Sequence, residues 1–487
     1  MSRVGDIYCV WDEPFGVWLA FQVWKPYNVP SRRECADQLD KLKSSHTGIT
    51  MLDWFSERFP DGNDMMNMKE FRRLGGSLRG FAVGSYISGD IPPYCKYLGN
   101  REQIGSRANG GYGRLSNEIS VIEHEQRWRS IPEEYLCLHA EGCLTIGKAA
   151  DQEQLSKQKM PYELTFFEYL PEKLADIIET YPLISRLRLV DCLYEGRLDL
   201  SRTYLTELEL NIDRVDELIL PETLLELNIG GAPKENFSIK AYENGRRIKL
   251  RVSGRAAFPK GLERCHAYSA VLTADEHFDI ERCVSAYPKL YSLCLWGEFG
   301  TISGFSALSG LKTLRSFLCT GFYGFAGDDF PTPEELTDIG EISVFDVPKE
   351  ALDVIKLRWK KAKSVEKYFR CGRTEEWMKE NRENPLRMWQ GREQIPLAKA
   401  KRAAKIYKEL RISALEAAEF GGTARLEELF KAASERFYAL DKKGEFLETV
   451  ELEELYDAAS GLVDEISEKA NAELDGESLL KWFDGMV

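Results

Sequence analysis

The chain has 487 residues, which is enough for about three domains of ordinary size. It carries 79 acidic and 65 basic residues, so its formal net charge is −14. A surface of that sign repels nucleic acid and anionic membranes, and it attracts basic proteins. No uncharged apolar run approaches the length of a membrane span, and the first residues show no export signal. We therefore expect a protein partner and exclude nucleic acid and membrane.

The cysteine pattern indicates a reducing compartment. Eleven cysteines are scattered along the chain, an odd number without tight pairing. Such a pattern does not resemble a disulfide framework, and most of these residues lie in apolar stretches. We expect a cytoplasmic protein whose cysteines are reduced.

Residues 1–155 are predicted to form a mixed, mainly β domain. Segments 6–11 and 17–24 are rich in strand formers and flank turn residues, which predicts a hairpin. The further elements expected here are a helix at 34–43, a strand at 49–55, and a second hairpin made of 134–139 and 143–146.

Residues 156–370 contain a repeated L-x-x-L-x-L pattern. Copies begin at Ile184, Leu205, Leu224, Leu290 and Ile339, and the first three are 21 and 19 residues apart. These intervals are close to the period of leucine-rich repeats. The leucine-proline pair that precedes the third copy also resembles the return segment of the short bacterial repeat. We predict a leucine-rich-repeat solenoid, in which 230–289 is decayed, interrupted or absent.

Residues 371–487 are predicted to be helical. Apolar residues recur at helical spacing, and the expected helices are 397–419, 425–441, 448–470 and 478–483. This pattern favours an antiparallel bundle that covers the end of the repeat array. The predicted fold class is α+β multidomain, with a mainly β N-terminal domain, a central leucine-rich-repeat solenoid and a C-terminal α-helical bundle.

The repeat register predicts a partner-binding surface. In L-x-x-L-x-L the leucines face the core, and the residues between them project from the exposed sheet. A flat face of charged and amide side chains is better suited to holding a protein than to building a catalytic pocket. The carboxylates would give this face an acidic strip. The residues predicted to project are Arg186, Arg188, Glu207, Glu209, Asn211, Glu226, Asn228, Ser292, Cys294 and Trp296.

A second candidate contact lies just before the helical region. The segment Trp389-Gln-Gly-Arg-Glu combines an aromatic residue, a glycine and a charge pair. One interpretation is a helix-entry loop with Trp389 buried and Glu393 near the positive end of the helix. The other is a partner contact through Trp389 and Arg392.

Motifs for nucleotide or metal binding are incomplete. Gly142–Lys148 fits G-x-x-x-x-G-K, but Ala149 stands where a nucleotide site needs Ser or Thr. A plain hairpin is the favoured interpretation. The spacing of Cys137, His139 and Cys143 matches no zinc module. We predict neither a metal nor a cofactor.

Catalytic motifs are similarly scarce. The chain has five histidines, and neither a G-x-S-x-G elbow nor an H-E-x-x-H helix is present. Glu123-His124-Glu125 would be an acid–base cluster or, as we favour, a solvated charged stretch. The sequence predicts no catalytic residue.

Two short motifs in the N-terminal domain resemble a family of bacterial immunity proteins. These are the G-D-I-Y strand at 5–8 and the aromatic L-D-W-F segment at 52–55, and the resemblance covers roughly 100 residues. Such proteins neutralise the toxin domains of polymorphic toxin and contact-dependent competition systems. The family implies occlusion of the toxin's active site without catalysis. This chain departs from the family's pattern, since its members are commonly single small domains.

Three functional hypotheses follow. The first is an immunity protein that binds and occludes the toxin domain of a cognate antibacterial polymorphic toxin, being monomeric before binding. The second is a leucine-rich-repeat adaptor or scaffold for an endogenous protein partner. The third is an enzyme that reverses a toxin's modification. The sequence leaves open whether the toxin is a nuclease, a deaminase or an ADP-ribosyltransferase.

Overall fold

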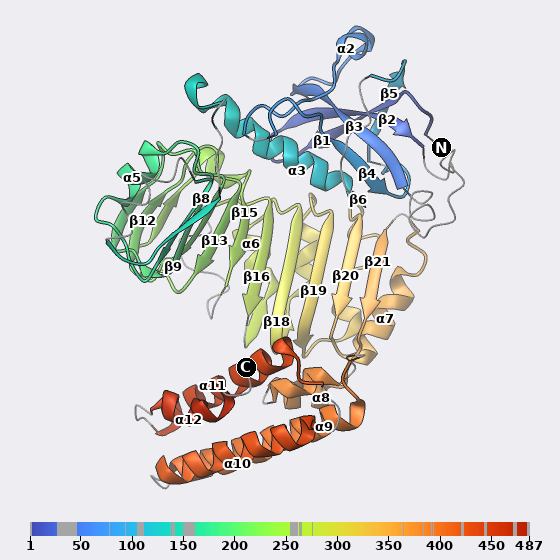
Figure 1. The fold of residues 1–487 in the computed structure, drawn as a ribbon. Coiled ribbons are helices and arrows are strands. Elements are labelled where there is room, and N and C mark those ends of the chain that lie inside the picture. Colours follow the sequence, from blue (N-terminus) through green and yellow to red (C-terminus); the bar gives the residue numbers. More distant parts are fainter. Residues whose placement is uncertain are drawn as a thin grey trace.

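A computed structural model describes most of the chain (Figure 1). The expected helix at 34–43 lies outside the described residues. The described ranges are 2–26, 46–76, 78–92, 94–104, 112–136, 138, 142–149, 161–253, 262, 265–274, 276–363, 365–382, 384–390, 392, 394–419, 423–442, 446–470 and 475–484.

The N-terminal domain is a six-stranded sheet with one helix packed on it. The expected hairpin is confirmed, because β1 and β2 pair antiparallel, and the strand expected at 49–55 is part of β3. Apolar side chains of these strands form a core with Ile122 of α3, while α2 (Gly62–Asn67) leads away from β3. The strand order is β5 (Lys96–Asn100), β1 (Asp6–Asp12), β2 (Val17–Lys25), β3 (His46–Ser56), β4 (Gly84–Ser88) and β6 (Tyr112–Gly113), with α3 at Leu115–Gln126.

The second expected hairpin is wrong. Glu133–Tyr135 forms a 3-10 turn, η2, and β7 (Cys143–Ile146) pairs parallel with β8 (Glu163–Phe167). β7 is therefore the first strand of the large central sheet. Its alternating burial fits both arrangements, so local periodicity alone could not choose between them.

The central region is built on one large parallel sheet. Segments 186–189, 207–210 and 226–229 pair parallel and in register, as the repeat pattern predicts. The predicted leucines lie in one continuous core with those of the neighbouring strands. After β7 and β8, the strands follow in the order β9 (Arg186–Leu193), β11 (Glu207–Asn211), β13 (Glu226–Gly230), β15 (Lys249–Val252), β16 (Ser269–Ala274), β18 (Ser292–Ser303), β19 (Ser316–Tyr323), β20 (Glu341–Phe345) and β21 (Glu366–Arg370), with β17 (His277–Asp279) beside β18.

The predicted leucine-rich-repeat solenoid is nevertheless wrong as a fold class. A second parallel sheet, β10 (Gly196–Asp199), β12 (Val215–Ile219) and β14 (Ser238–Lys240), lies opposite only the early strands. Later connections are helical, so the twelve-stranded sheet stays open and no closed solenoid forms. These connections are α6 (Ile280–Ala286), η6 (Phe305–Gly310), η7 (Gly327–Asp329) and α7 (Lys349–Trp359), while α5 (Leu174–Thr180) and η4 (Tyr242–Gly245) lie earlier.

Two sequence features account for this difference. Only the copy that begins at Leu224 is directly preceded by a leucine-proline pair, Leu220-Pro221, so this return could not represent all the connections. The sheet also continues through 230–289, where β15 and β16 supply Leu250 and Leu272 to the core without an L-x-x-L-x-L copy. The parallel strand is therefore the repeated element, and the segment that connects one strand to the next varies along the chain.

Several strands have a residue in the left-handed conformation at or near their carboxyl end. Glu168 and Asp191 occupy matching places at one side of the sheet, and Gly321, Asp346 and Cys371 do so at the other. At Gly321 a side chain is excluded, because a Cβ there would lie 2.0 Å from the Gly297 carbonyl oxygen. The carboxyl edge of the sheet is thus shaped by a recurring turn.

The C-terminal region folds as the predicted helices around a separate core. That core includes Phe430, Phe437 and Phe483. The sequence predicts that this region covers the end of the array, and this prediction is wrong. Its first helix, α8, packs instead against β18 and β19, in the middle of the carboxyl edge of the sheet. The helices are α8 (Glu375–Arg382), η8 (Pro385–Trp389), α9 (Leu397–Glu419), α10 (Thr423–Asp441), α11 (Thr449–Ala470) and α12 (Gly476–Asp484).

Candidate functional site

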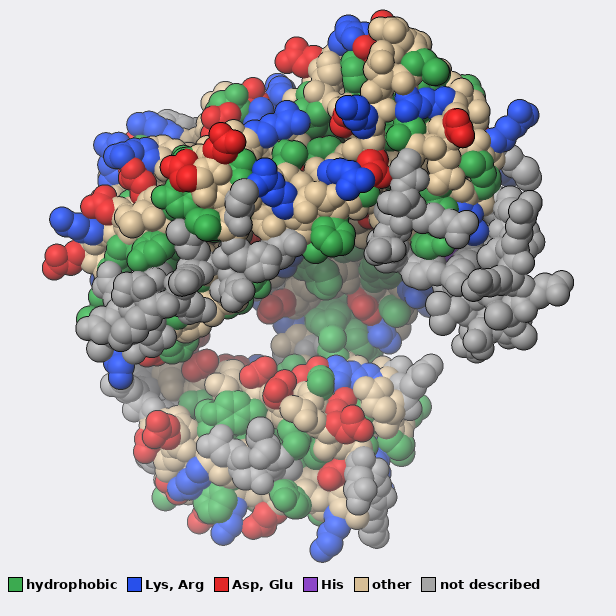
Figure 2. All heavy atoms as spheres, turned by 45° about the horizontal axis from the view of Figure 1, so that its top comes forward, with side chains coloured by type: hydrophobic (Ala, Val, Ile, Leu, Met, Phe, Trp, Pro, Cys, Tyr) green, Lys and Arg blue, Asp and Glu red, His purple; other side chains and the backbone are tan. Residues whose placement is uncertain are grey.

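None of the described elements covers one face of the large sheet, which lies between two flanking domains. The N-terminal domain lies at the amino ends of the strands and the C-terminal helices lie at their carboxyl ends (Figure 1). The connecting helices pack on the opposite face, where the core is. Figure 2 shows a hollow between the two domains, with hydrophobic side chains in its depth. We call this hollow, with the uncovered sheet face as its floor, the trough.

The part of the trough floor over β8–β13 carries a ladder of ion pairs. Arg186 bridges Glu163, at 2.8 Å, and Glu207, to which it donates two hydrogen bonds. In the next row of the sheet, Arg188 Nε lies 2.8 Å from a carboxylate oxygen of Glu209. The hydrogen bonds that the two arginines donate to these carboxylates raise the pKa of both guanidinium groups. Opposite charges therefore alternate in register from β8 to β9 to β11, whereas Glu226 of β13 lies beside Glu207 with the same sign.

The predicted acidic strip is consequently wrong. Glu207 and Glu209 are paired with arginines, and Glu226 lies 3.8 Å from Lys249. The predicted positions do project from the floor, but their charges are largely compensated within it. The pattern L-x-x-L-x-L fixes which side chains are exposed and says nothing about the strand placed beside them.

The two predicted amide residues occupy different settings on this floor. Asn228 stands beside Glu209 in the same row. Asn211 instead accepts a hydrogen bond from the backbone N–H of Asp213, at 2.8 Å, and so caps the turn after β11. Asn228 remains a candidate contact, whereas Asn211 has a local structural role.

The floor over β16–β19 is uncharged and partly apolar. Val271, Cys294 and Leu318 lie side by side in one row across three strands. In the following row Trp296 is 50% exposed and stands between two threonines. Ser292 begins the same strand in a half-buried position. A contiguous apolar area of this kind is typical of a protein-interaction surface.

The helical side of the trough contains the second predicted contact. Trp389 is 1% exposed, packs on Phe446 and donates a 2.8 Å hydrogen bond to Glu454. Arg392 binds Glu454 and the buried Glu451. The structure thus matches the helix-entry alternative for Trp389 and places Arg392 in an ion pair within the domain. Glu393 lies outside the described residues.

A buried arginine joins the N-terminal domain to the sheet. Arg127, in η1 (Arg127–Arg129), is 7% exposed and donates to the carbonyl oxygens of Tyr204, Pro182 and Ile184, at 2.6–3.1 Å. These carbonyls lie in the loops that precede β9 and β11. Burial lowers the pKa of Arg127 to about 10, so the group stays charged at neutral pH. The arginine fixes one wall of the trough to its floor.

Buried carboxylates occupy the same joint. Asp12 and Glu123 are 3% and 6% exposed, and Lys249 of the sheet lies 3.9 Å from Glu123. Burial, followed by the charge of Glu123, raises the pKa of Asp12 to about 8. Burial also raises the pKa of Glu123. Both groups are enclosed where the N-terminal domain meets the sheet.

The favoured interpretation of residues 123–125 as a solvated stretch is therefore wrong. Glu125 is also buried, where it binds Arg73 and the backbone N–H of Leu74. His124 Nδ1 lies 2.8 Å from the carbonyl oxygen of Ser120, in its own helix. These acids hold the N-terminal domain together and to the sheet, and their arrangement provides no acid–base pair around a substrate cavity.

The other motifs provide no reactive site in the described part of the chain. Gly142–Lys148 encloses the strand β7, so its backbone forms a sheet rather than a phosphate cradle. Cys137 and His139 lie outside the described residues. Among the residues that are described, no group of three His, Cys, Asp or Glu side chains could hold a metal ion.

Sequence reasoning missed the apolar half of the trough. Val271 lies in the interval 230–289, where the repeat pattern is broken, Leu318 lies in none of the five copies, and Met388 directly precedes the candidate segment that begins at Trp389. Period-two alternation in 269–274 and 316–320 was the available signal. Nothing in the local sequence indicated that Met388, which is 50% exposed, would stand near Trp296.

No protein-family model, curated protein or solved structure matches this chain. None of the described helices is both long and apolar enough to cross a bilayer.

Proposed function

We propose that this protein binds another protein in the trough. The observation that carries the proposal is the uncovered apolar floor over β16–β19, between two walls that are anchored to the sheet. An exposed apolar area costs solubility, and binding a partner would compensate by removing it from water. The neighbouring ion-pair ladder would supply orientation and discrimination between partners.

We further propose that the partner is the toxin domain of an antibacterial polymorphic toxin. This step rests on the resemblance of the G-D-I-Y and L-D-W-F segments to bacterial immunity proteins. Both segments lie in strands, at the start of β1 and within β3. The net charge of −14 favours a basic partner. The protein would act in the cytoplasm as a non-catalytic inhibitor, monomeric until it binds.

The alternative is an adaptor for an endogenous partner, which would use the same surface. An enzyme reversing a toxin's modification is less well supported, since the carboxylates Asp12 and Glu123 are enclosed in a domain joint. A toxin gene adjacent to the gene for this protein would favour immunity, and its product is the natural binding probe.

The test is the affinity of that toxin domain for two matched variants. Leu318→Arg introduces a charge on the apolar floor, whereas Leu357→Arg makes the same change on α7, where the side chain is 73% exposed. We expect Leu318→Arg to weaken binding at least about tenfold, which corresponds to 1.4 kcal/mol. We expect no change from Leu357→Arg. Equal affinities of both variants and the wild type would exclude the trough floor as the binding surface.

A further inference from the structure

A pocket lies where the trough floor meets the C-terminal helices. It has a volume of about 650 Å³, within the range of ligand-binding sites. The carboxyl ends of β18 and β19 form one side, and η8 with α11 forms the other. It is continuous with the apolar floor through Trp296 and Thr320. A partner lying in the trough could therefore extend a side chain into it.

Two large apolar side chains line this pocket while remaining half exposed. Trp296 projects from β18 and Met388 from η8, and each is 50% exposed. The neighbours of Met388 in η8, Leu386 and Trp389, are buried in the helical core. Met388 is thus turned away from that core. Tryptophan supplies a rigid contact surface, and methionine adapts its shape to what it meets.

The pocket rim is acidic. Four carboxylates, Glu298, Asp346, Glu454 and Asp457, surround it together with one guanidinium, that of Arg382. Figure 2 shows acidic side chains along the helical side of the hollow. A basic segment would therefore be attracted, and an acidic segment repelled.

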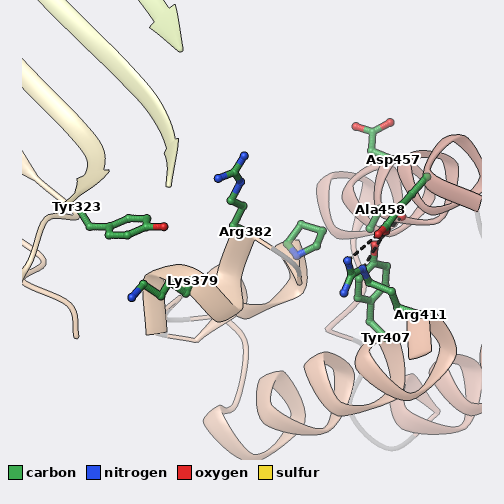
Figure 3. Close-up of a pocket in the computed structure, with 10 residues that line it drawn as sticks. Tyr323, Lys379, Arg382, Tyr407, Arg411, Asp457 and Ala458 are labelled. Atoms are coloured by element: carbon green, nitrogen blue, oxygen red, sulfur yellow. Dashed lines mark hydrogen bonds and ion pairs between the residues drawn. The ribbon is translucent and has the colours of Figure 1, made fainter. Parts of the chain in front are cut away.

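The charges on the rim are not equally available. Arg373 pairs with Asp346 at 3.0 Å, and Arg392 pairs with Glu454 at 2.6 Å. Asp457 is exposed on α11, and no ion pair connects it to another residue within the described ranges. Figure 3 shows Asp457 and Arg382 projecting on the same side of α11 and α8. Asp457 is the carboxylate best placed to receive an incoming cation.

We infer that this pocket takes an aromatic or long aliphatic side chain of the bound protein, with lysine or arginine beside it in sequence. The apolar group would pack between Trp296 and Met388, and the adjacent cation would meet Asp457. This inference rests on the proposed function, because it names the segment of the partner that the trough recognises. A side chain enclosed in this way is the usual form of a binding hot spot.

The test is a selection of displayed random linear peptides against the full-length protein. We expect enriched peptides to share an aromatic or long aliphatic residue next to lysine or arginine. Thr320→Trp fills the pocket from the floor, and Thr165→Trp makes the same change on β8, over the charged ladder. Thr320→Trp should lower binding of the enriched peptides at least about tenfold, and Thr165→Trp should leave it unchanged.

Charge dependence provides the second readout. Asp457→Asn should weaken binding of the basic peptides and leave that of variants with neutral flanks unchanged. Enrichment of acidic peptides, binding that survives Thr320→Trp, or no enrichment at all would overturn the inference. The proposed function has a separate test: it would be contradicted if the toxin domain bound Leu318→Arg as tightly as it binds the wild type. A toxin domain that is sensitive to Leu318→Arg but insensitive to Thr320→Trp would overturn the pocket inference alone.

Discussion

The buried Asp12 makes a sharp prediction about pH. Its pKa is raised from 3.8 to about 8, first by burial and then by the charge of Glu123, and its Oδ2 atom has no hydrogen-bond partner among the described residues. The folded protein therefore keeps this proton over a pH range in which the unfolded chain has released it. Stability should fall as pH rises from about 4 to about 8, by at most about 1.4 kcal/mol per pH unit.

Asp12→Asn removes this dependence while preserving the size of the side chain. Near pH 4 the variant and the wild type should differ little, because the unfolded chain is then still partly protonated at Asp12. By about pH 8 the variant should be more stable by up to about 5 kcal/mol, the sum over roughly four pH units.

The assay is urea unfolding followed by tryptophan fluorescence at several pH values between these limits. The control is Asp353→Asn, since Asp353 is exposed on α7 and Lys349 lowers its pKa. The stability of the control should not rise relative to that of the wild type as pH increases. Parallel stability curves for Asp12→Asn and the wild type would refute the argument, because Asp12 would then be ionised in the folded state.

Three further changes probe the packing and the walls of the trough. Leu208→Ala should destabilise the protein by about 2–5 kcal/mol in the same urea assay, because a fully buried leucine leaves a cavity; a loss below about 1 kcal/mol would contradict one continuous core. Arg127→Met should cost on the order of 3 kcal/mol and make the N-terminal domain more sensitive to proteolysis, since three buried carbonyl groups lose their donor; unchanged proteolysis would remove its anchoring role. Glu207→Lys should lower the unfolding free energy by about 1 kcal/mol because it breaks the ion pair with Arg186, whereas Glu207→Gln should lower it less. Unfolding free energies of both variants equal to that of the wild type would show that this pair contributes nothing.

The sequence predicted the parts of the fold that local periodicity determines. The hairpin of β1 and β2, the parallel strands that begin at Arg186, Glu207 and Glu226, and the long C-terminal helices follow from spacing alone. Each has a regular apolar pattern over enough residues to distinguish helix from strand. These elements are as predicted.

Features that depend on distant partners could not be predicted. Cys143–Ile146 joins β8 rather than its neighbour in sequence, and no local signal distinguishes these pairings. The open form of the sheet depends on how each connection packs behind it, and the connections share no single pattern. The local sequence gives no sign that Glu207 is ion-paired, because its partner Arg186 lies 21 residues away along the chain. Predicting the candidate site required knowing which strands and domains lie side by side.

Contact between position 318 and the partner is the most direct test of the binding proposal. A photoreactive phenylalanine analogue would replace Leu318 on the trough floor, or Leu357 on the outer side of α7 as the control. With the toxin domain at saturating concentration, we predict a covalent adduct from position 318 and none from position 357. An adduct from position 357 alone, or from neither position while the complex is shown to form, would contradict binding in the trough.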